Sequence, residues 1–271
     1  MSESDTLQTA VDAAKVAGEI LLRYLEQGVQ MRNKSADGGH SYDLVSDADI
    51  DSERAVADLI RSRFPDHELL GEENLDGDRN AEHLWIIDPL DGTNNYAHGV
   101  PHFAVSIAYY RRGQPVSGAV YHPSRDVMYT ATADGPAKID GVPVRVGDEN
   151  SLADVLVGCG FYYDRGEVMR KTLATIESLF AKDIHGIRRM GTASLDLIMV
   201  GCGMFGGFFE FELSPWDFAA GRLFVERAGG KVTTCTGEAL GIQRTSLLAT
   251  NGRLHDEMLD IVSSHYRGEA G

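Results

Sequence analysis

Residues 85–93 read Trp85-Ile86-Ile87-Asp88-Pro89-Leu90-Asp91-Gly92-Thr93, an apolar run that leads directly into two aspartates. A strand over this run fixes Asp88 at its end, where the carboxylate meets a low-dielectric core. Pro89 fixes the turn because it lacks an amide hydrogen, and Gly92 permits a left-handed backbone. The two carboxylates and the Leu90 carbonyl between them form a set of hard oxygen ligands that suits Mg²⁺. An ordinary Asp-Pro and Asp-Gly turn is the simpler interpretation when this segment is considered alone.

The chain before this motif predicts two helices. Apolar residues recur at steps of four and three over residues 7–25, which is the pattern of an amphipathic helix. A polar, glycine-containing loop at residues 35–41 follows. Ser46-Asp47-Ala48-Asp49 then forms a capping box that opens a second helix. That helix is expected to end near Phe64, because Pro65 follows.

The remaining elements predict a mixed α/β fold with two sheets packed between layers of helices. Hairpin-linked strands up to about residue 146 indicate an antiparallel meander, and strands alternate with helices after about residue 150. We expect one domain over residues 1–271, with an antiparallel-sheet lobe at about 1–148 and an α/β lobe at about 149–271. The predicted strands are residues 68–70, 84–87, 104–110, 116–121, 127–132, 155–158, 208–211, 231–233 and 247–250. The later helices are predicted at residues 167–181, 194–200, 217–228 and 255–266.

Composition and charge exclude several classes of protein. The chain has 271 residues, of which 43% are hydrophobic, so it is neither intrinsically disordered nor fibrous. Its 25 basic and 41 acidic residues give a net charge of −16, which argues against binding to nucleic acid or to an anionic membrane. The longest run without Asp, Glu, Lys, Arg or His, residues 197–209, is shorter than the roughly 18 residues that a membrane-spanning helix needs.

The termini and cysteines predict a cytoplasmic location. The first residues, Met1-Ser2-Glu3-Ser4-Asp5, are acidic and polar and do not resemble a signal or transit peptide. The three cysteines, Cys159, Cys202 and Cys235, are widely spaced and form no C-x-x-C motif. We interpret them as small buried hydrophobic residues in a reducing compartment.

Three further acidic segments are candidate functional sites, each with a simpler alternative. Glu72-Glu73 follows a predicted strand, and only one of two adjacent side chains can face a given point from a strand. The alternative is a solvated pair. Asp217 begins a helix and could simply complement the helix dipole. Asp49 could simply complete its capping box.

Gly201-Cys202-Gly203-Met204-Phe205-Gly206 matches the dinucleotide fingerprint G-x-G-x-x-G but lacks its context. The fingerprint requires a preceding strand and a following helix. Here an apolar helical run precedes the glycines and an aromatic strand follows. We therefore predict that these glycines end a helix and allow close packing.

Taken together, the motifs resemble those of the inositol monophosphatase family, a family of lithium-sensitive, Mg²⁺-dependent phosphomonoesterases. The resemblance runs in order from about residue 7 to residue 265. The D-P-L-D-G-T motif and the later W-D-x-A-A-G motif are its most specific parts. The segments that carry it are Asp43-Leu44-Val45-Ser46-Asp47-Ala48-Asp49, Phe64-Pro65-Asp66-His67, Gly71-Glu72-Glu73, residues 85–106, Gly191-Thr192-Ala193-Ser194 and Trp216-Asp217-Phe218-Ala219-Ala220-Gly221.

The resemblance implies a layered α-β-α-β-α sandwich, a homodimer, and two or three Mg²⁺ ions in each active site. It implies that Asp49 and Thr93 form a proton-accepting dyad beside the attacking water, with Glu72 also taking part in catalysis. One departure from the family pattern is Asn94, where the family usually has Thr. The implied metal ligands are Glu72, Asp88, the Leu90 carbonyl, Asp91 and Asp217. The implied substrate contacts are Leu90, Gly92, Thr93, Gly191, Thr192, Ala193, Glu210 and Asp217.

The implied reaction is hydrolysis of a small phosphomonoester by metal-activated water. We rank inositol monophosphate first, because a carboxylate at Glu210 can accept hydrogen bonds from its hydroxyl groups. Histidinol phosphate and fructose 1,6-bisphosphate, substrates of related enzymes, remain as alternatives. A regulatory binding protein without turnover is a further alternative, but it would not require the Thr93 and Asp49 pair. For Glu210 itself, the alternative is a solvent-facing residue at a sheet edge.

Overall fold

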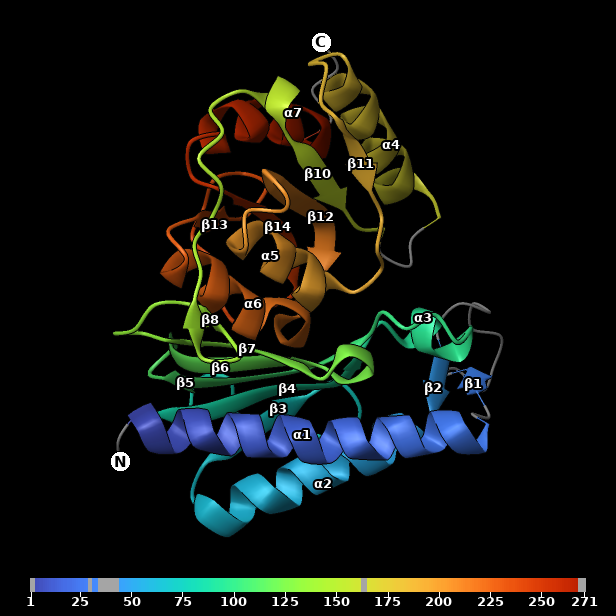
Figure 1. Ribbon diagram of the computed structural model, residues 1–271, viewed down its shortest axis with the longest axis vertical. Helices are drawn as coiled ribbons and strands as arrows, with labels where there is room; N and C mark the ends of the chain where they lie inside the picture. The colour runs from blue at the N-terminus through green and yellow to red at the C-terminus, as the bar shows by residue number, and fades with distance from the viewer. Residues whose placement is uncertain (1–2, 29–30, 34–43, 162–164, 268–271) are drawn as a thin grey trace.

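The computed structural model describes residues 3–28, 31–33, 44–161 and 165–267, and the loop predicted at residues 35–41 lies outside them, as does Asp43. The described chain forms five layers, which alternate between helices and sheets (Figure 1). This arrangement confirms the predicted α-β-α-β-α sandwich. The layers are, in order, a helix pair, a seven-stranded sheet, a second helix pair, a five-stranded sheet and a third helix pair.

The outer helices α1 and α2 cover one face of the first sheet because each presents an apolar stripe to it. Ala10, Ala14, Ala17 and Leu21 of α1 are fully buried in the core beneath that sheet. The predicted capping box of α2 is present, and the helix ends at the predicted place, before Phe64. The bounds are α1 (Glu3–Gln27) and α2 (Asp47–Arg63).

The first sheet has the strand order β3-β4-β5-β6-β7-β8-β9. The chain thus runs along it from neighbour to neighbour, and every pair from β4 onward is antiparallel, which confirms the predicted meander. The exception is β3, which pairs with β4 in parallel. The strands are β3 (Glu68–Gly71), β4 (His83–Asp91), β5 (Ala104–Arg111), β6 (Gln114–His122), β7 (Val127–Thr132), β8 (Lys138–Ile139) and β9 (Val142–Pro143).

The second sheet has the strand order β11-β10-β12-β14-β13. β10 pairs in parallel with β11 and β12, whereas β14 is antiparallel to both of its neighbours. Helices α4 and α7 cover its outer face and contact each other. The elements are β10 (Leu156–Cys159), β11 (Gly186–Arg188), β12 (Gly207–Leu213), β13 (Lys231–Thr233), β14 (Thr245–Thr250), α4 (Glu167–Phe180) and α7 (His255–Arg267).

The central helices α5 (Ala193–Gly201) and α6 (Pro215–Arg227) lie between the two sheets (Figure 1). Leu195 and Ile198 pack toward the first sheet, while Leu197 and Val200 pack toward the second. The predicted end of α5 at the glycine-rich segment is confirmed. A Cβ at Gly201 would clash with Phe224 of α6, so this glycine permits close helix contact.

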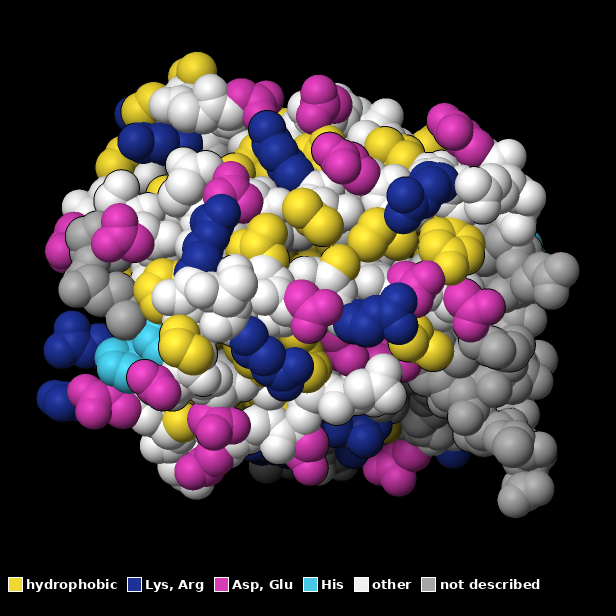
Figure 2. All heavy atoms as spheres, turned by 90° about the horizontal axis from the view of Figure 1, so that it is seen from below, with side chains coloured by type: hydrophobic (Ala, Val, Ile, Leu, Met, Phe, Trp, Pro, Cys, Tyr) yellow, Lys and Arg dark blue, Asp and Glu magenta, His cyan; other side chains and the backbone are white. Residues whose placement is uncertain are grey.

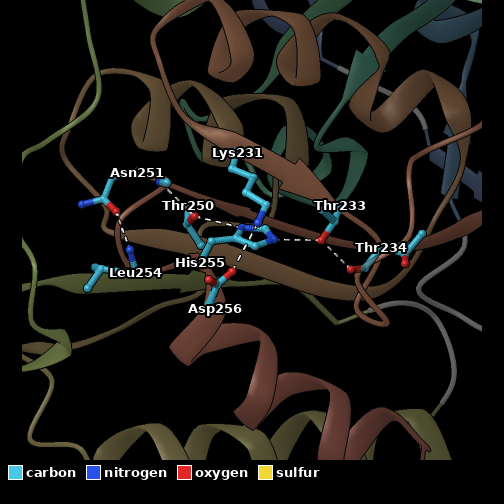
Figure 3. Close-up of polar contacts among 9 residues, drawn as sticks. Lys231, Thr233, Thr234, Thr250, Asn251, Leu254, His255 and Asp256 are labelled. Atoms are coloured by element: carbon cyan, nitrogen blue, oxygen red, sulfur yellow. Dashed lines mark hydrogen bonds and ion pairs between the residues drawn. The ribbon is translucent and has the colours of Figure 1, made fainter.

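Hydrogen bonds of the His255 ring connect the beginning of α7 to the second sheet (Figure 3). The ring is fully buried, with Nδ1 3.0 Å from the Thr250 hydroxyl and Nε2 3.0 Å from the Thr233 hydroxyl. The Leu254 amide donates to Asn251 Oδ1 at 3.1 Å. These contacts join β13, β14 and α7.

The structure contains short elements that the sequence pattern did not predict. They lack enough residues to show a hydrophobic period. They are β1 (Met31–Asn33), β2 (Leu44–Ser46), α3 (Thr93–Ala97), β11 and two short 3₁₀ helices (Pro123–Arg125 and Leu152–Asp154).

The described structure shows how side chains are distributed on one face and how far the cysteines are buried. On the face formed by α1 and α2, acidic, basic and hydrophobic side chains are intermingled (Figure 2). Cys159 and Cys235 are buried and Cys202 is partly buried, and all three are free thiols. Among the described helices, none is long and apolar enough to cross a membrane.

Candidate active site

A cleft of about 280 Å³ opens where the first sheet, the central helices and the second sheet meet. It collects segments that lie far apart in the sequence: the ends of β3, β4 and β12 and the beginnings of α3, α5 and α6. Every site residue predicted from the sequence lines it except Asp49. The predicted residues in its wall are Glu72, Asp88, Leu90, Asp91, Gly92, Thr93, Gly191, Thr192, Ala193, Glu210 and Asp217.

An irregularity in β4 turns both aspartates of the first motif toward the cleft. Asp88 lies opposite Ser106, but Asp91 lies opposite Ala104, so β4 contains one residue more than β5 over this stretch and forms a β-bulge. An extra residue in one strand re-aims the side chains that follow it. Both carboxylates therefore face the central helices, while the Leu90 side chain is buried in the core beneath the sheet.

Gly92 gives the backbone the sharp turn that follows Asp91. Its φ is +93°, in the left-handed region that the sequence suggested. A Cβ at this position would clash with the Thr192 hydroxyl, so a side chain would separate the two walls of the cleft. α3 then begins at Thr93, whose hydroxyl donates to the Leu90 carbonyl at 3.1 Å.

Glu72 and Asp217 approach the aspartates from two other elements. Because β3 and β4 are parallel and Gly71 pairs with Ile87, Glu72 and Asp88 follow at the same edge of the sheet. Asp217 lies in the first turn of α6, where its Oδ2 accepts a hydrogen bond from the Ser214 amide at 2.7 Å. Of the adjacent glutamates, only Glu72 lines the cleft.

Burial and mutual repulsion disfavour the ionised forms of these carboxylates. Burial, followed by the charges of Glu72, Asp91 and Asp217, raises the pKa of Asp88 well above its usual value. Burial and the same glutamate raise the pKa of Asp217. Burial also raises the pKa of Asp91 to about 6, although its Oδ2 accepts a 2.6 Å hydrogen bond from the Ser194 amide.

Asp49 and Thr93 have different hydrogen-bond partners in this structure. Asp49 is 1% exposed, and its Oδ2 accepts from the Ser46 amide at 2.8 Å and from the Ser46 hydroxyl at 2.6 Å. Thr93 donates to Leu90 instead. Asp49 thus completes the capping box of α2 and lies outside the wall of the cleft.

The opposite wall of the cleft carries the residues expected to contact the alcohol. The Thr192 hydroxyl donates to the His102 carbonyl at 2.9 Å, which connects the beginning of α5 to the segment just before β5. Glu210 is buried on the central strand β12 and shares the face of Phe208, toward α5 and α6. Burial and the charge of Asp196 raise the pKa of Glu210. The alternative of a solvent-facing glutamate at a sheet edge is therefore wrong.

Two charged residues of the cleft were not predicted. Asp196 is 1% exposed, and within the described structure its Oδ1 has no hydrogen-bond partner. Arg189 lies two residues before Gly191. Both neighbour the Gly191-Thr192-Ala193 motif in sequence, and that proximity was the available signal. Nothing in their own spacing marked them, because Asp196 falls within an apolar helix and Arg189 within a loop.

The donor set fits a divalent cation. Asp88 is 1% exposed, and in the described part of the chain its Oδ2 has no hydrogen-bond partner. Carboxylate and carbonyl oxygens, which this wall offers, are the ligands that Mg²⁺ prefers. No three His, Cys, Asp or Glu side chains of the described residues already stand close enough to hold a metal ion. A bound cation would therefore have to draw the mutually repelling carboxylates together.

Comparison with known proteins places this cleft in a family. A model of the inositol monophosphatase family matches residues 2–267. The putative Nus factor SuhB of Neisseria meningitidis serogroup B is 38% identical over 260 residues, covering 96% of this chain and 98% of the relative. The inositol-1-monophosphatase of Rhizobium meliloti is 37% identical over 265 residues, covering 97% of each chain. The solved structure of inositol monophosphatase from Anabaena has a TM-score of 0.84 at 38% identity and covers 96% of this chain and 95% of its own. The chain belongs to the inositol monophosphatase family.

Proposed function

We propose that this protein is a Mg²⁺-dependent phosphomonoesterase that hydrolyses inositol monophosphate to inositol and phosphate. The observation that carries the proposal is the buried carboxylate of Asp88. One of its oxygens lacks a hydrogen-bond partner among the described residues, and burial, followed by the charges of other carboxylates, raises its pKa. Such a group is costly to bury unless a cation compensates it.

We assign the metal ligands to Glu72, Asp88, Asp91, Asp217 and the Leu90 carbonyl, holding two or three Mg²⁺ ions. When bound, Mg²⁺ would offset the charge of the substrate phosphate and lower the pKa of the attacking water. The fold supports this assignment because three separate elements, the end of β3, β4 and the beginning of α6, present these oxygens to one cleft.

The residues of the turn after β4 would bind and orient the phosphate. The backbone N–H groups of Gly92 and Thr93 lie at the beginning of α3, where amides lack intrahelical partners and suit an anion. The Thr93 hydroxyl would accept the proton of the attacking water together with Asp49. In this role Thr93 must exchange its hydrogen bond to Leu90 for one toward Asp49.

Gly191, Thr192, Ala193 and Glu210 would hold the alcohol. The Glu210 carboxylate can accept hydrogen bonds from two hydroxyl groups of a polyol. Histidinol phosphate is a second candidate substrate, because Glu210 and Asp196 are two buried acidic groups at this end of the cleft. The ammonium group of histidinol phosphate would interact favourably with these two carboxylates.

The deciding experiment is a phosphate-release screen with purified protein and millimolar Mg²⁺. Inositol 1-phosphate, histidinol phosphate and fructose 1,6-bisphosphate would be compared, with EDTA in place of Mg²⁺ as the control. We expect the highest kcat/KM for inositol 1-phosphate and no release with EDTA. Absence of release from every ester would favour the alternative of a regulatory binding protein.

We also propose that the chain is a single domain with lobes at about 1–148 and 149–271, that it forms a homodimer, and that it acts in the cytoplasm. The central helix α6 supports a single domain, because it packs against strands of both sheets. Sedimentation velocity over a range of protein concentrations would test the homodimer.

A further inference from the structure

Glu53 is a buried carboxylate of α2 that contacts the turn following β3. The residue is 2% exposed. Both of its oxygens are engaged, because Oε1 accepts from the Glu73 amide at 2.9 Å and Oε2 accepts from the Asn74 amide at 2.7 Å. These two amides directly follow Glu72, which lines the cleft and is a proposed metal ligand. One side chain of α2 therefore holds the backbone beside a residue of the cleft.

The backbone itself closes the base of this turn. The Gly71 amide donates to the Leu75 carbonyl at 2.9 Å, and the Gly77 amide donates to the Leu69 carbonyl at 2.9 Å. The chain after Glu72 thus folds back along β3. The amides at the tip of the turn lie beyond these backbone pairs, and buried amides need an acceptor. The carboxylate from α2 accepts from two of them.

Gly71 allows the Glu53 carboxylate to approach the turn this closely. A Cβ at this glycine would clash with Glu53 Oε1. Gly71 is also the last residue of β3, where it pairs with Ile87 of β4. The helix carboxylate, the end of the strand and the proposed metal ligand Glu72 therefore meet at one point.

Glu72 needs such support because the neighbouring carboxylates repel it. Burial is the main cause of the raised pKa values of Asp88 and Asp217, and the charge of Glu72 adds to both. Without a cation, this repulsion favours a Glu72 side chain that turns away from the cleft. A restrained turn limits the backbone freedom that Glu72 would otherwise lose when a cation binds.

We propose that Glu53 is a positioning residue of the metal centre, which keeps the Glu72 carboxylate directed toward the cation by holding the two amides that follow it. The inference rests on the proposed function, because it takes Glu72 to be a metal ligand. Glu53 lies outside the wall of the cleft, so it acts through Glu72. A role that only joins α2 to the first sheet is the alternative that the test must separate.

The test measures Mg²⁺ affinity by calorimetric titration of the protein without substrate. Glu53→Gln keeps the side-chain volume but turns an NH₂ group toward one of the two amides. Glu53→Asp keeps the charge but is one methylene shorter, so it cannot reach both. We expect the Kd for Mg²⁺ to rise about tenfold or more in Glu53→Gln and about threefold or more in Glu53→Asp. The Mg²⁺ concentration for half-maximal rate should rise in parallel, whereas saturating Mg²⁺ should restore most of kcat.

The matched control is Val56→Ala, at a fully buried position of the same helix. It should lower the melting temperature of the metal-free protein, because it leaves a cavity, and it should keep the Mg²⁺ affinity of wild type. An equal loss of affinity in this control would overturn the proposal. Wild-type affinity in Glu53→Gln would also overturn it. So would wild-type affinity in Glu53→Asp, because the charge alone would then suffice.

Gly71→Ala disturbs the same contact from the other side, since its Cβ displaces Glu53 Oε1 and leaves both glutamates in place. It should weaken Mg²⁺ binding as Glu53→Gln does, and unchanged affinity would contradict the proposal even if the Glu53 variants do not fold.

The titration also separates this inference from the proposed function. If wild type binds Mg²⁺ but hydrolyses no ester, the proposed function fails, and the affinities of the variants still decide the role of Glu53. If inositol 1-phosphate is hydrolysed but Glu53→Gln binds Mg²⁺ as wild type does, only the role of Glu53 fails. Absence of Mg²⁺ binding by wild type would overturn both.

Discussion

Asp88 shows how one residue can combine burial with a charge that the surrounding protein does not balance. Its Oδ1 accepts from the Leu90 amide at 3.1 Å, whereas its Oδ2 has no partner among the described residues. Burial first, and neighbouring carboxylates second, raise its pKa. Burying a carboxylate that the protein does not balance costs folding free energy, and proteins retain such costs at functional sites.

We predict that Asp88→Asn and Asp217→Asn are folded but lose activity by about 100-fold or more, because changes even to groups that support metal ligands cost 10–100-fold. Each substitution keeps the side-chain volume and removes a ligand charge. Steady-state kinetics with Mg²⁺ would measure the loss, and circular dichroism would verify folding. Asp58→Asn, at an exposed position of α2, is the matched control. Near-normal turnover in either cleft variant would contradict the metal assignment.

Glu210→Gln should change which alcohol is preferred and largely spare the phosphoryl chemistry. Replacing the carboxylate weakens charge-assisted hydrogen bonds worth about 1.5–3 kcal/mol each. The loss of kcat/KM should therefore be large for inositol 1-phosphate and small for a simple ester without those hydroxyl groups. Glu212→Gln, two residues along β12 and outside the cleft, serves as the control. Equal losses on both esters would remove Glu210 from the specificity site.

At the scale of the elements, short polar contacts decide how the helices join the sheets. His255 is an example, because its ring bridges Thr233 of β13 and Thr250 at the end of β14 (Figure 3). Burial, followed by the charge of Lys231, lowers the pKa of His255 to about 4. The folded protein therefore keeps this ring neutral at pH values where an unfolded chain, with a histidine pKa of about 6.5, becomes protonated.

We predict that His255 contributes a loss of stability as the pH is lowered from about 7 toward 4, opposite in sign to the contribution of the cleft carboxylates, whose raised pKa values make the folded state bind protons first. In this window the unfolded state binds a proton that the folded state excludes, so acid favours unfolding. The difference between the two pKa values corresponds to roughly 3 kcal/mol, at about 1.4 kcal/mol per pKa unit. Urea unfolding at several pH values would measure the slope. Between pH 7 and pH 4, His255→Gln should lose less stability, or gain more, than wild type and than the exposed control His98→Gln. Identical slopes in all three would contradict the assignment.

At the scale of the whole molecule, the cleft exists only because the three inner layers of the fold come together. The first sheet supplies Asp88 and Asp91, the central helices supply Asp217 and Ala193, and the second sheet supplies Glu210. The repelling carboxylates thus link the stability of the assembled fold to cation binding.

We predict that Mg²⁺ raises the melting temperature. Binding to the native state alone stabilises by RT ln(1 + [L]/Kd), about 2.7 kcal/mol at a hundredfold excess over Kd. For a chain of this size the corresponding shift is roughly 5–10 °C. Thermal melts in excess Mg²⁺ and in EDTA would measure it, and Asp88→Asn should lose most of the shift. An unchanged melting temperature in wild type would mean that the carboxylates do not share a cation.

Lithium should inhibit the enzyme if it replaces one Mg²⁺ without supplying a divalent charge. The expectation comes from the family to which the chain belongs. Initial rates at increasing LiCl, with matched NaCl to control ionic strength, would test it. Equal rates in the two salts would count against a lithium-sensitive site.

Local sequence patterns predicted the main elements, because hydrophobic periods, capping residues and turn residues act over a few neighbouring positions. The long helices and most strands appear within a few residues of their predicted bounds, and the capping box at Ser46 is present. Short elements such as β11 and α3 escaped prediction because three to five residues carry no measurable period. The direction of β3 also escaped it, since strand pairing depends on contacts between distant segments.

Which carboxylates share the cleft depends on contacts between distant segments of the folded chain. The resemblance suggested most of the wall, but the bulge in β4 is what turns Asp88 and Asp91 to one side, and pairing with the distant β5 defines that bulge. Asp196 and Arg189 line the cleft, but no sequence signal of their own predicted this. Only the packing of α5 between the sheets brings them there. Local sequence specifies local geometry, whereas burial and mutual charge depend on the assembled layers. Those two properties give the cleft its chemistry.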